Sequence, residues 1–207
     1  MAGEQNTATG AKAPVAARSV ALWDPVVRLF HWALVLAFFA VWFLGKFGPD
    51  QMTLHFYAGY AVGGLVLLRL IWGIIGPAPA RFTSFVRGPK AVMAYARHLP
   101  ARRPSNTLGH NAVGALFVVG ILAVLVVQVT TGLIGDPEDY VNTGPLADYV
   151  AIETSRTALS LHELLGNLAM IMVIVHIAAI GFYRRWKGED LVTPMITGKK
   201  QIPAETD

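Results

Sequence analysis

Cysteine is absent from the 207 residues, which excludes disulfides, zinc sites with Cys ligands, iron–sulfur clusters and any cofactor attached through a thioether. Charged residues are also scarce, at 14% of the chain, whereas an ordinary soluble domain has about a quarter. Apolar residues make up 54%, which is too much for a water-soluble globule of this length and indicates a lipid bilayer as the solvent. The net charge of +4 then fits positive loops on one side of a membrane better than nucleic-acid binding.

Four apolar segments are each near the ~20 residues that a helix needs to cross a bilayer. They cover residues 29–47, 54–75, 112–134 and 161–183. The predicted fold class is all-α, an integral membrane four-helix bundle, with one transmembrane domain over residues 21–186. We expect a disordered tail over residues 1–20, which lack the apolar stretch of a signal peptide, and a second tail over 187–207. Two short surface helices are expected near 90–98 and 146–157.

The charges of the loops predict the orientation of the bundle. Segment 76–109 carries six Lys or Arg residues and no Asp or Glu, and the C-terminal tail also opens with three cations. The loop at 135–159 carries five acidic residues against the single Arg156. Positive loops stay in the cytoplasm, so we expect both termini and segment 76–109 to be cytoplasmic.

Histidine is the polar residue that stands out in the apolar segments. Five of the six histidines lie in these segments or at their ends, where an unpaired polar group is costly. The predicted topology places His31 and His176 near the cytoplasmic ends of the first and fourth helices. It places His55 and His162 near the outer ends of the second and fourth helices. We therefore expect two histidine pairs, one near each membrane surface.

The fourth segment indicates what these pairs hold. His162 and His176 are 14 residues apart, so both lie on one helix face, about 21 Å apart along the axis. Residues without bulky side chains lie on the same helix faces as the histidines. They are Gly166, Ala169 and Val173 in the fourth segment, and Gly59 and Gly63 in the second. Such residues either let helices pack closely or leave room for a flat macrocycle. Bis-imidazole ligation holds haem in helical bundles, and without cysteine this haem is type b.

Other polar residues near the cytoplasmic level have more than one interpretation. His110 opens the third segment. It is an alternative partner of His176, a contact to a haem propionate or to a quinone, a hydrogen-bond donor behind the ligands, or a plain interfacial histidine. Arg69 and Arg28 either extend to the lipid headgroups or pair with a haem propionate. His98 lies in the basic loop and is expected at the surface.

Several short motifs occur in an order that resembles a known family. They are Trp23-Asp24-Pro25 followed by Arg28-Leu29-Phe30-His31-Trp32, His55 with Arg69 and Trp72-Gly73, Gly109-His110-Asn111, Thr131-Gly132-Leu133, Gly144-Pro145-Leu146-Ala147, His162 with His176, and Met195-Ile196-Thr197-Gly198. Over residues 22–198 the sequence resembles the bacterial cytochrome b561 family. Within that family it is similar to the b-type cytochrome subunits of nickel–iron hydrogenases.

The resemblance implies a di-haem membrane cytochrome in the bacterial inner membrane. It implies two noncovalent b haems, with His31 and His176 as ligands of the inner haem and His55 and His162 as ligands of the outer one. The implied activity is electron transfer between the quinone pool and an external redox partner, either a cytochrome c-like or multihaem protein or a subunit of a membrane complex.

Two other functions compete with this interpretation. A stand-alone quinone-linked oxidoreductase would act on a small molecule such as superoxide, although the acidic outer loop disfavours an anion. A histidine-lined metal transporter would place its site near the midplane, whereas these histidines lie near both surfaces.

Overall fold

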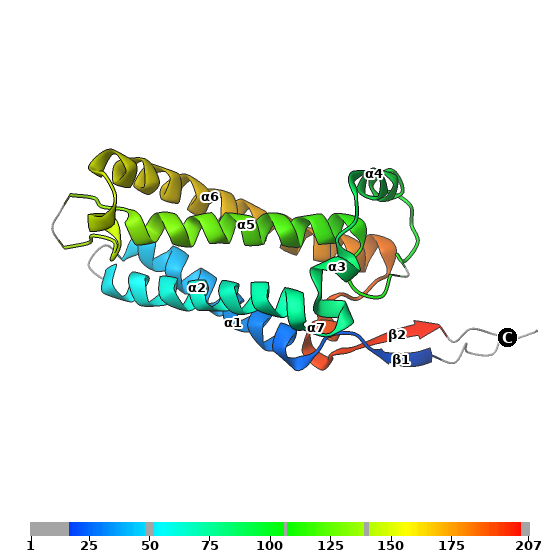
Figure 1. Ribbon diagram of the computed structural model, residues 1–207. Helices are drawn as coiled ribbons and strands as arrows, with labels where there is room; N and C mark the ends of the chain where they lie inside the picture. The colour runs from blue at the N-terminus through cyan, green and yellow to red at the C-terminus, as the bar shows by residue number, and fades with distance from the viewer. Residues whose placement is uncertain (1–16, 49–51, 106, 139–140, 204–207) are drawn as a thin grey trace, which may run out of the picture.

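Four long helices form the body of the protein in the computed structural model, which describes residues 17–48, 52–105, 107–138 and 141–203 (Figure 1). They are α1 (Pro25–Phe47), α2 (Met52–Ile75), α5 (Ala112–Ile134) and α6 (Ile152–Phe182), and a π-helical turn, Tyr183–Lys187, continues α6. In the described part of the chain, these are the four helices long and apolar enough to cross a membrane. The predicted all-α membrane bundle is therefore confirmed.

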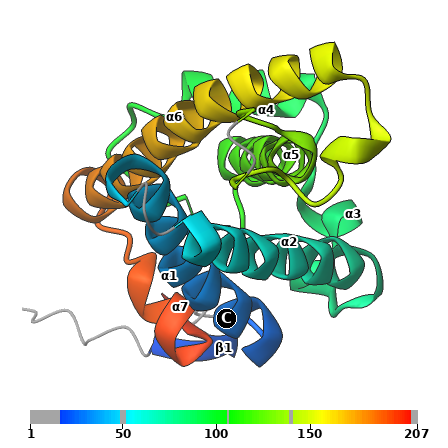
Figure 2. The same cartoon turned by 90° about the vertical axis from the view of Figure 1, so that its left-hand side faces the viewer.

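The helices contact one another in the order α1–α2, α2–α5 and α5–α6. In Figure 2 the end of the bundle that carries the loop between α5 and α6 faces the viewer. We call this the outer end. The inner end is the opposite one, where α1 and α5 begin (Figure 1).

The first and last long helices begin earlier than the apolar segments suggest. Helix α1 begins at Pro25 because the Asp24 carboxylate accepts hydrogen bonds from the backbone N–H groups of Val26 (2.9 Å) and Val27 (3.1 Å). Helix α6 begins at Ile152, nine residues before the expected Leu161. Its first turns are polar and extend the helix beyond the apolar segment, because a helix does not have to begin where the hydrocarbon core begins. The helix expected at 146–157 is instead a 3₁₀ turn, Ala147–Tyr149, followed by the start of α6.

Both expected tails contain regular structure. Residues 1–16 lie outside the described residues, but Ala17–Ala21 forms strand β1. The expected tail 187–207 contains helix α7 (Val192–Thr197) and strand β2 (Lys199–Pro203). The two strands pair antiparallel, with Arg18 opposite Ile202, and project beyond the inner end (Figure 1). Strand pairing between the two ends of a chain has no local hydropathy signal, so the sequence predicted neither strand. Residues 17–20 belong to β1 rather than to the disordered tail expected over residues 1–20.

Helices α3 (Phe82–Phe85) and α4 (Pro89–Arg97), which follow α2, lie at the inner end of the bundle (Figure 1). Segment 76–111 also contains a 3₁₀ turn (Ala78–Ala80), and α4 matches the surface helix expected near 90–98. A buried carboxylate, Glu189, ties this segment to the C-terminal strand. It accepts hydrogen bonds from the Ser105 hydroxyl (2.7 Å) and from Lys200 Nζ (2.7 Å).

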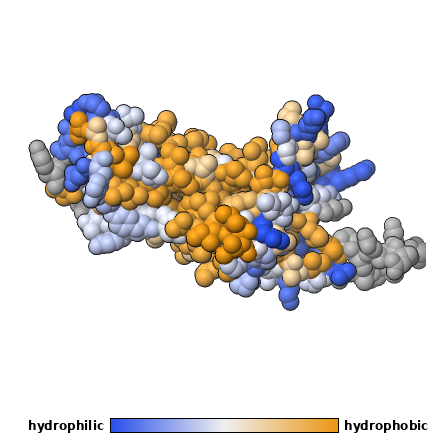
Figure 3. Space-filling view, viewed as in Figure 1, coloured by the Kyte–Doolittle hydropathy of each residue, from blue (hydrophilic) through white to orange (hydrophobic). Residues whose placement is uncertain are grey.

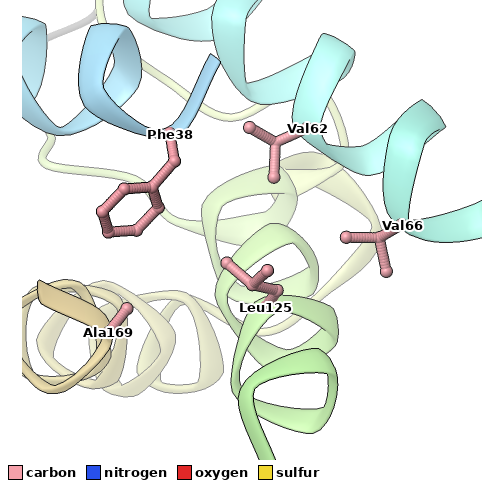
Figure 4. Close-up of a cluster of buried hydrophobic side chains, with 5 residues drawn as sticks. All are labelled: Phe38, Val62, Val66, Leu125 and Ala169. Atoms are coloured by element: carbon pink, nitrogen blue, oxygen red, sulfur yellow. The ribbon is translucent and has the colours of Figure 1, made fainter. Parts of the chain in front are cut away.

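Apolar side chains lie both in the centre of the bundle and on its outside. Figure 4 shows the central cluster of Phe38, Val62, Val66, Leu125 and Ala169, whose exposed fractions are at most 8%. On the outside, large apolar side chains form a band between two hydrophilic ends (Figure 3). A surface of this kind is stable only against lipid. Ala169 is seven residues from both His162 and His176, so the central cluster lies between the levels of these two histidines.

Candidate functional site

The histidines of the long helices come together as two pairs. The imidazole centroids of His55 and His162 are 6.1 Å apart at the outer end, and those of His31 and His176 are 6.4 Å apart at the inner end. A nitrogen–metal bond to histidine is about 2.0–2.1 Å, so two imidazoles on opposite sides of one metal ion have centroids about 6 Å apart. Both pairs therefore have the separation that bis-imidazole ligation requires.

Backbone carbonyl groups orient both imidazoles of the outer pair. His55 Nδ1 lies 2.9 Å from the Val41 carbonyl oxygen, and His162 Nδ1 lies 2.8 Å from that of Gln128. A carbonyl oxygen only accepts, so each Nδ1 carries the proton and donates it. Each Nε2 is then left unprotonated as a metal ligand, and its basicity is raised by the hydrogen bond on the other side of the ring.

A cavity of about 480 Å³ opens beside the outer pair, lined by residues of all four long helices. Gly59, Gly166 and Ala169 line it, as the sequence suggested for residues beside a macrocycle. Gly63 has a different role, because a Cβ atom there would lie 3.1 Å from Val129 Cγ1, so this glycine permits close packing of α2 against α5.

Two polar atoms at the outer cavity have no hydrogen-bond partner in the described structure. They are Trp42 Nε1 and Gln128 Oε1, and both are buried. Buried polar atoms are nearly always paired in native proteins. Together with the apolar lining and the volume, which lies within the range of cofactor sites, these atoms indicate that a ligand fills the cavity. The residues at this site fit a haem group.

Aromatic contacts hold the inner pair. His176 stacks on Phe117, with ring centroids 5.4 Å apart and an angle of 15° between the planes. His31 meets Trp32 edge to face at 5.0 Å, and the Trp32 indole N–H donates to the Met195 carbonyl oxygen at 3.2 Å. His31 Nδ1 is buried and has no partner among the described residues. The inner pair is thus positioned by packing, whereas the outer pair is positioned by hydrogen bonds.

Arg69 is buried near the inner pair and does not reach the surface. Its exposed fraction is 4%, its guanidinium carbon lies 4.8 Å from the centroid of the Phe82 ring, and its Nη1 is unpartnered in the described structure. The interpretation in which Arg69 extends to the headgroups is therefore wrong. Helix α3 covers the position, and the sequence alone did not show that α3 exists.

Three further groups lie at the same end of the bundle. Arg28 donates from Nη2 to the Ile196 carbonyl oxygen, which ties α1 to α7, and its Nε is buried without a partner. His110 lies between the rings of Trp23 (4.8 Å) and Phe85 (4.6 Å), and its Nδ1 is likewise unpartnered in the described structure. Burial and the positive charge of Arg69 lower the pKa of His110 to about 4, so it is neutral at physiological pH. His98, at the C-terminal end of α4, is exposed as expected.

Two glycines that touch the outer imidazoles were missed by sequence reasoning as site residues. A Cβ atom at Gly45 would lie 2.9 Å from His55 Cε1, and one at Gly132 would lie 2.8 Å from His162 Cε1. Each glycine comes from a different helix than the histidine it contacts. Glycine in an apolar helix is a weak signal by itself, because it also serves helix packing.

Within the described residues, no group of three or more His, Asp or Glu side chains converges as a metal-ion site. The histidines form pairs instead, as a ligand set for a planar cofactor does. A sequence model of the prokaryotic cytochrome b561 family matches residues 22–198, which include all four long helices. A comparison with curated proteins found no match. With two histidine pairs across an apolar four-helix bundle and this match over most of its length, the chain belongs to the prokaryotic cytochrome b561 family, whose members are transmembrane b-type cytochromes of electron transfer.

Proposed function

We propose that the protein carries electrons across the bacterial inner membrane between the quinone pool and an external redox partner. His31 and His176 would hold one noncovalent b haem, and His55 and His162 would hold the other. The observation that carries the proposal is the centroid separation of 6.4 Å and 6.1 Å in pairs at opposite ends of the bundle. When bound, haem iron supplies one-electron redox chemistry.

The protein's own groups hold and separate the two cofactors. The carbonyl groups of Val41 and Gln128 fix the tautomer and the orientation of the outer imidazoles. The central cluster around Phe38, Leu125 and Ala169 lies between the two levels and forms one wall of the outer cavity, and its buried apolar side chains are proposed to keep water out. Exclusion of water keeps the local dielectric low, so nearby charges act strongly on each haem.

Arg69, Arg28 and His110 are proposed to contact either the propionates of the inner haem or a quinone. Each has a buried nitrogen without a partner in the described structure. The two guanidinium groups are suited to carboxylates. Neutral His110 has one donor and one acceptor on its ring, which also suits a quinone oxygen.

The inner end is proposed to be cytoplasmic because segment 76–109 is basic. The external partner would then dock at the acidic outer loop, as a cytochrome c-like protein, a multihaem protein or a complex subunit. Several carboxylates of this loop already have partners within the protein. Asp136 Oδ1 accepts hydrogen bonds from the Glu138 N–H (2.7 Å) and from the Thr143 hydroxyl (3.2 Å). Glu138 and Glu153 are paired with Arg156 at 2.6 Å and 3.0 Å, and Asp139 lies outside the described residues. Exposed Asp148 is not among these ion pairs.

A haem assay of the purified protein tests the proposal. We expect a reduced-minus-oxidised spectrum of b type and a pyridine assay that gives two haems per chain. His162→Ala should remove only the outer haem and His176→Ala only the inner one, because each pair loses one of the two histidines proposed to hold the iron. A stoichiometry of one or none in the wild type, or loss of the inner haem from His110→Ala but not from His31→Ala, would contradict these assignments.

A stand-alone oxidoreductase acting on a small anion such as superoxide is the second candidate. The observation in its favour is that Lys46 lines the outer cavity and is the one Lys or Arg among the lining residues. Haem reduction by superoxide that Lys46→Gln slows, with no requirement for a protein donor, would favour this candidate over an electron-transfer subunit.

A further inference from the structure

Helix α4 lies across the direction of the bundle at the inner end. Figure 1 shows α4 end-on beside α5, whereas the long helices run across the view. None of its residues is buried. Tyr95 attaches it, because the Tyr95 and Tyr183 hydroxyl groups are 2.9 Å apart. Helix α4 is therefore a surface helix fixed by one face.

The opposite face of α4 combines two cations with an apolar centre. Lys90, Met93, Ala94 and Arg97 have the i, i+3, i+4, i+7 spacing of one helix face, and all four are exposed. With Pro89 they line an open, shallow hollow on the surface of this one helix. Met93 is 58% exposed within it. An apolar stripe flanked by Lys and Arg is typical of a helix that lies in a membrane interface.

The surroundings of α4 are positive, and among the described residues none of the cations of segment 76–109 forms an ion pair. Segment 76–109 has no Asp or Glu, and the ion pairs found among the described residues involve Arg156 and Lys200 instead. The Arg102 guanidinium lies 4.6 Å from the ring centroid of Trp186, which is 44% exposed. Tryptophan of this kind is enriched where the bilayer meets water.

We propose that the hollow on α4 binds the headgroup of an anionic phospholipid. Lys90 and Arg97 would contact the phosphate region from its two sides, and Met93 would contact the glycerol and upper acyl carbons. A lipid is favoured over a soluble partner because α4 lies beside the bundle, next to the apolar band that lipid must cover (Figure 3). The positive charge, the exposed apolar centre and the interfacial position match one phospholipid molecule at once.

The test uses the full-length holoprotein in nanodiscs of phosphatidylcholine with added phosphatidylglycerol. Native mass spectrometry then measures the ratio of anionic to zwitterionic lipid retained by the protein. Each cation near an anionic surface contributes about fivefold to binding, so Lys90→Gln/Arg97→Gln should lower the preference roughly 25-fold. The matched control is Arg18→Gln/Lys199→Gln, which removes the same charge from exposed positions on the β-sheet and should leave the preference unchanged. The haem spectrum of both variants should equal that of the wild type, because neither pair touches a histidine pair.

Three results would overturn the proposal. One is a wild type that retains the two lipids without preference. Another is an equal loss in the control variant, which would show a general charge effect. The third is displacement of the retained lipid by inorganic phosphate or by an acidic protein at low concentration, which would identify the hollow as a site for a soluble partner.

Discussion

Adding one methyl group at Gly45 or Gly132 should selectively weaken the outer haem site. A Cβ atom would lie 2.9 Å from His55 Cε1 in the first case and 2.8 Å from His162 Cε1 in the second, whereas ordinary contacts begin at 3.4 Å. The imidazole must therefore move by about 0.5–0.6 Å, and metal–ligand distances tolerate only about 0.2 Å. The same movement strains the hydrogen bonds to the Val41 and Gln128 carbonyls, which are 2.9 Å and 2.8 Å long.

The expected loss of haem affinity can be judged from these contacts. Overpacking of this kind costs about 1–3 kcal/mol, and disturbing the groups behind a ligand lowers metal affinity about 10- to 100-fold. We therefore expect Gly45→Ala and Gly132→Ala to lose the outer haem during purification or on dilution, while the inner haem stays bound. The pyridine assay should fall from two haems per chain toward one. A redox titration of each variant should show one haem reduction step instead of two.

The control for these variants is Gly64→Ala, which adds the same methyl group to α2 where no atom lies within 4 Å. It should keep both haems, and alanine should if anything favour the helix. Gly59→Ala is more informative, because Gly59 lines the outer cavity but has no protein atom within 4 Å of its added Cβ. Loss of haem from this variant would show that the ring lies against Gly59. Retention of both haems with unchanged potentials in Gly45→Ala and Gly132→Ala, or an equal loss of haem from Gly64→Ala, would contradict a clash between the added methyl groups and the outer imidazoles.

Other predictions concern the inner end. Arg69→Gln should lower the reduction potential of the inner haem by roughly tens of millivolts, because a buried positive charge stabilises the reduced form. Arg69→Lys keeps the charge and should retain most of the wild-type potential. Equal potentials in redox titrations of the wild type and Arg69→Gln would contradict this. Glu189→Gln should expose segment 98–109 to proteolysis. The side chains of Lys200 and Glu189 are only 13% and 5% exposed, and breaking a buried ion pair costs about 3–5 kcal/mol. A digestion pattern identical to that of the wild type would contradict this prediction. Burial raises the pKa of Glu189, but hydrogen bonds from Lys200 and Ser105 outweigh it and hold the pKa below the ordinary value of 4.5. The stabilisation is therefore present above that ordinary value and is lost as the pH falls through the lowered one, so thermal unfolding of wild type and Glu189→Gln should differ near neutral pH and converge in acid.

Local patterns in the sequence were sufficient for the membrane fold. Low charge and four apolar segments predict the four long helices, because hydropathy and helix length are properties of contiguous residues. The pairing of histidines by depth also follows from sequence position and loop charge, and the structure places His31 beside His176 and His55 beside His162. That these four are the haem ligands stays a prediction.

Contacts between distant segments were decided only by the tertiary structure. Strand β1, near the N-terminus, pairs with β2, near the C-terminus. Neither strand has a sequence pattern that predicts its partner. The burial of Arg69 depends on Phe82 in a separate helix, so its own surroundings in α2 could not distinguish a headgroup contact from a buried charge. Gly132 likewise contacts an imidazole from α6. Hydropathy determines which segments enter the membrane, whereas the faces that meet inside it depend on helix rotation and packing, which residue type alone does not encode.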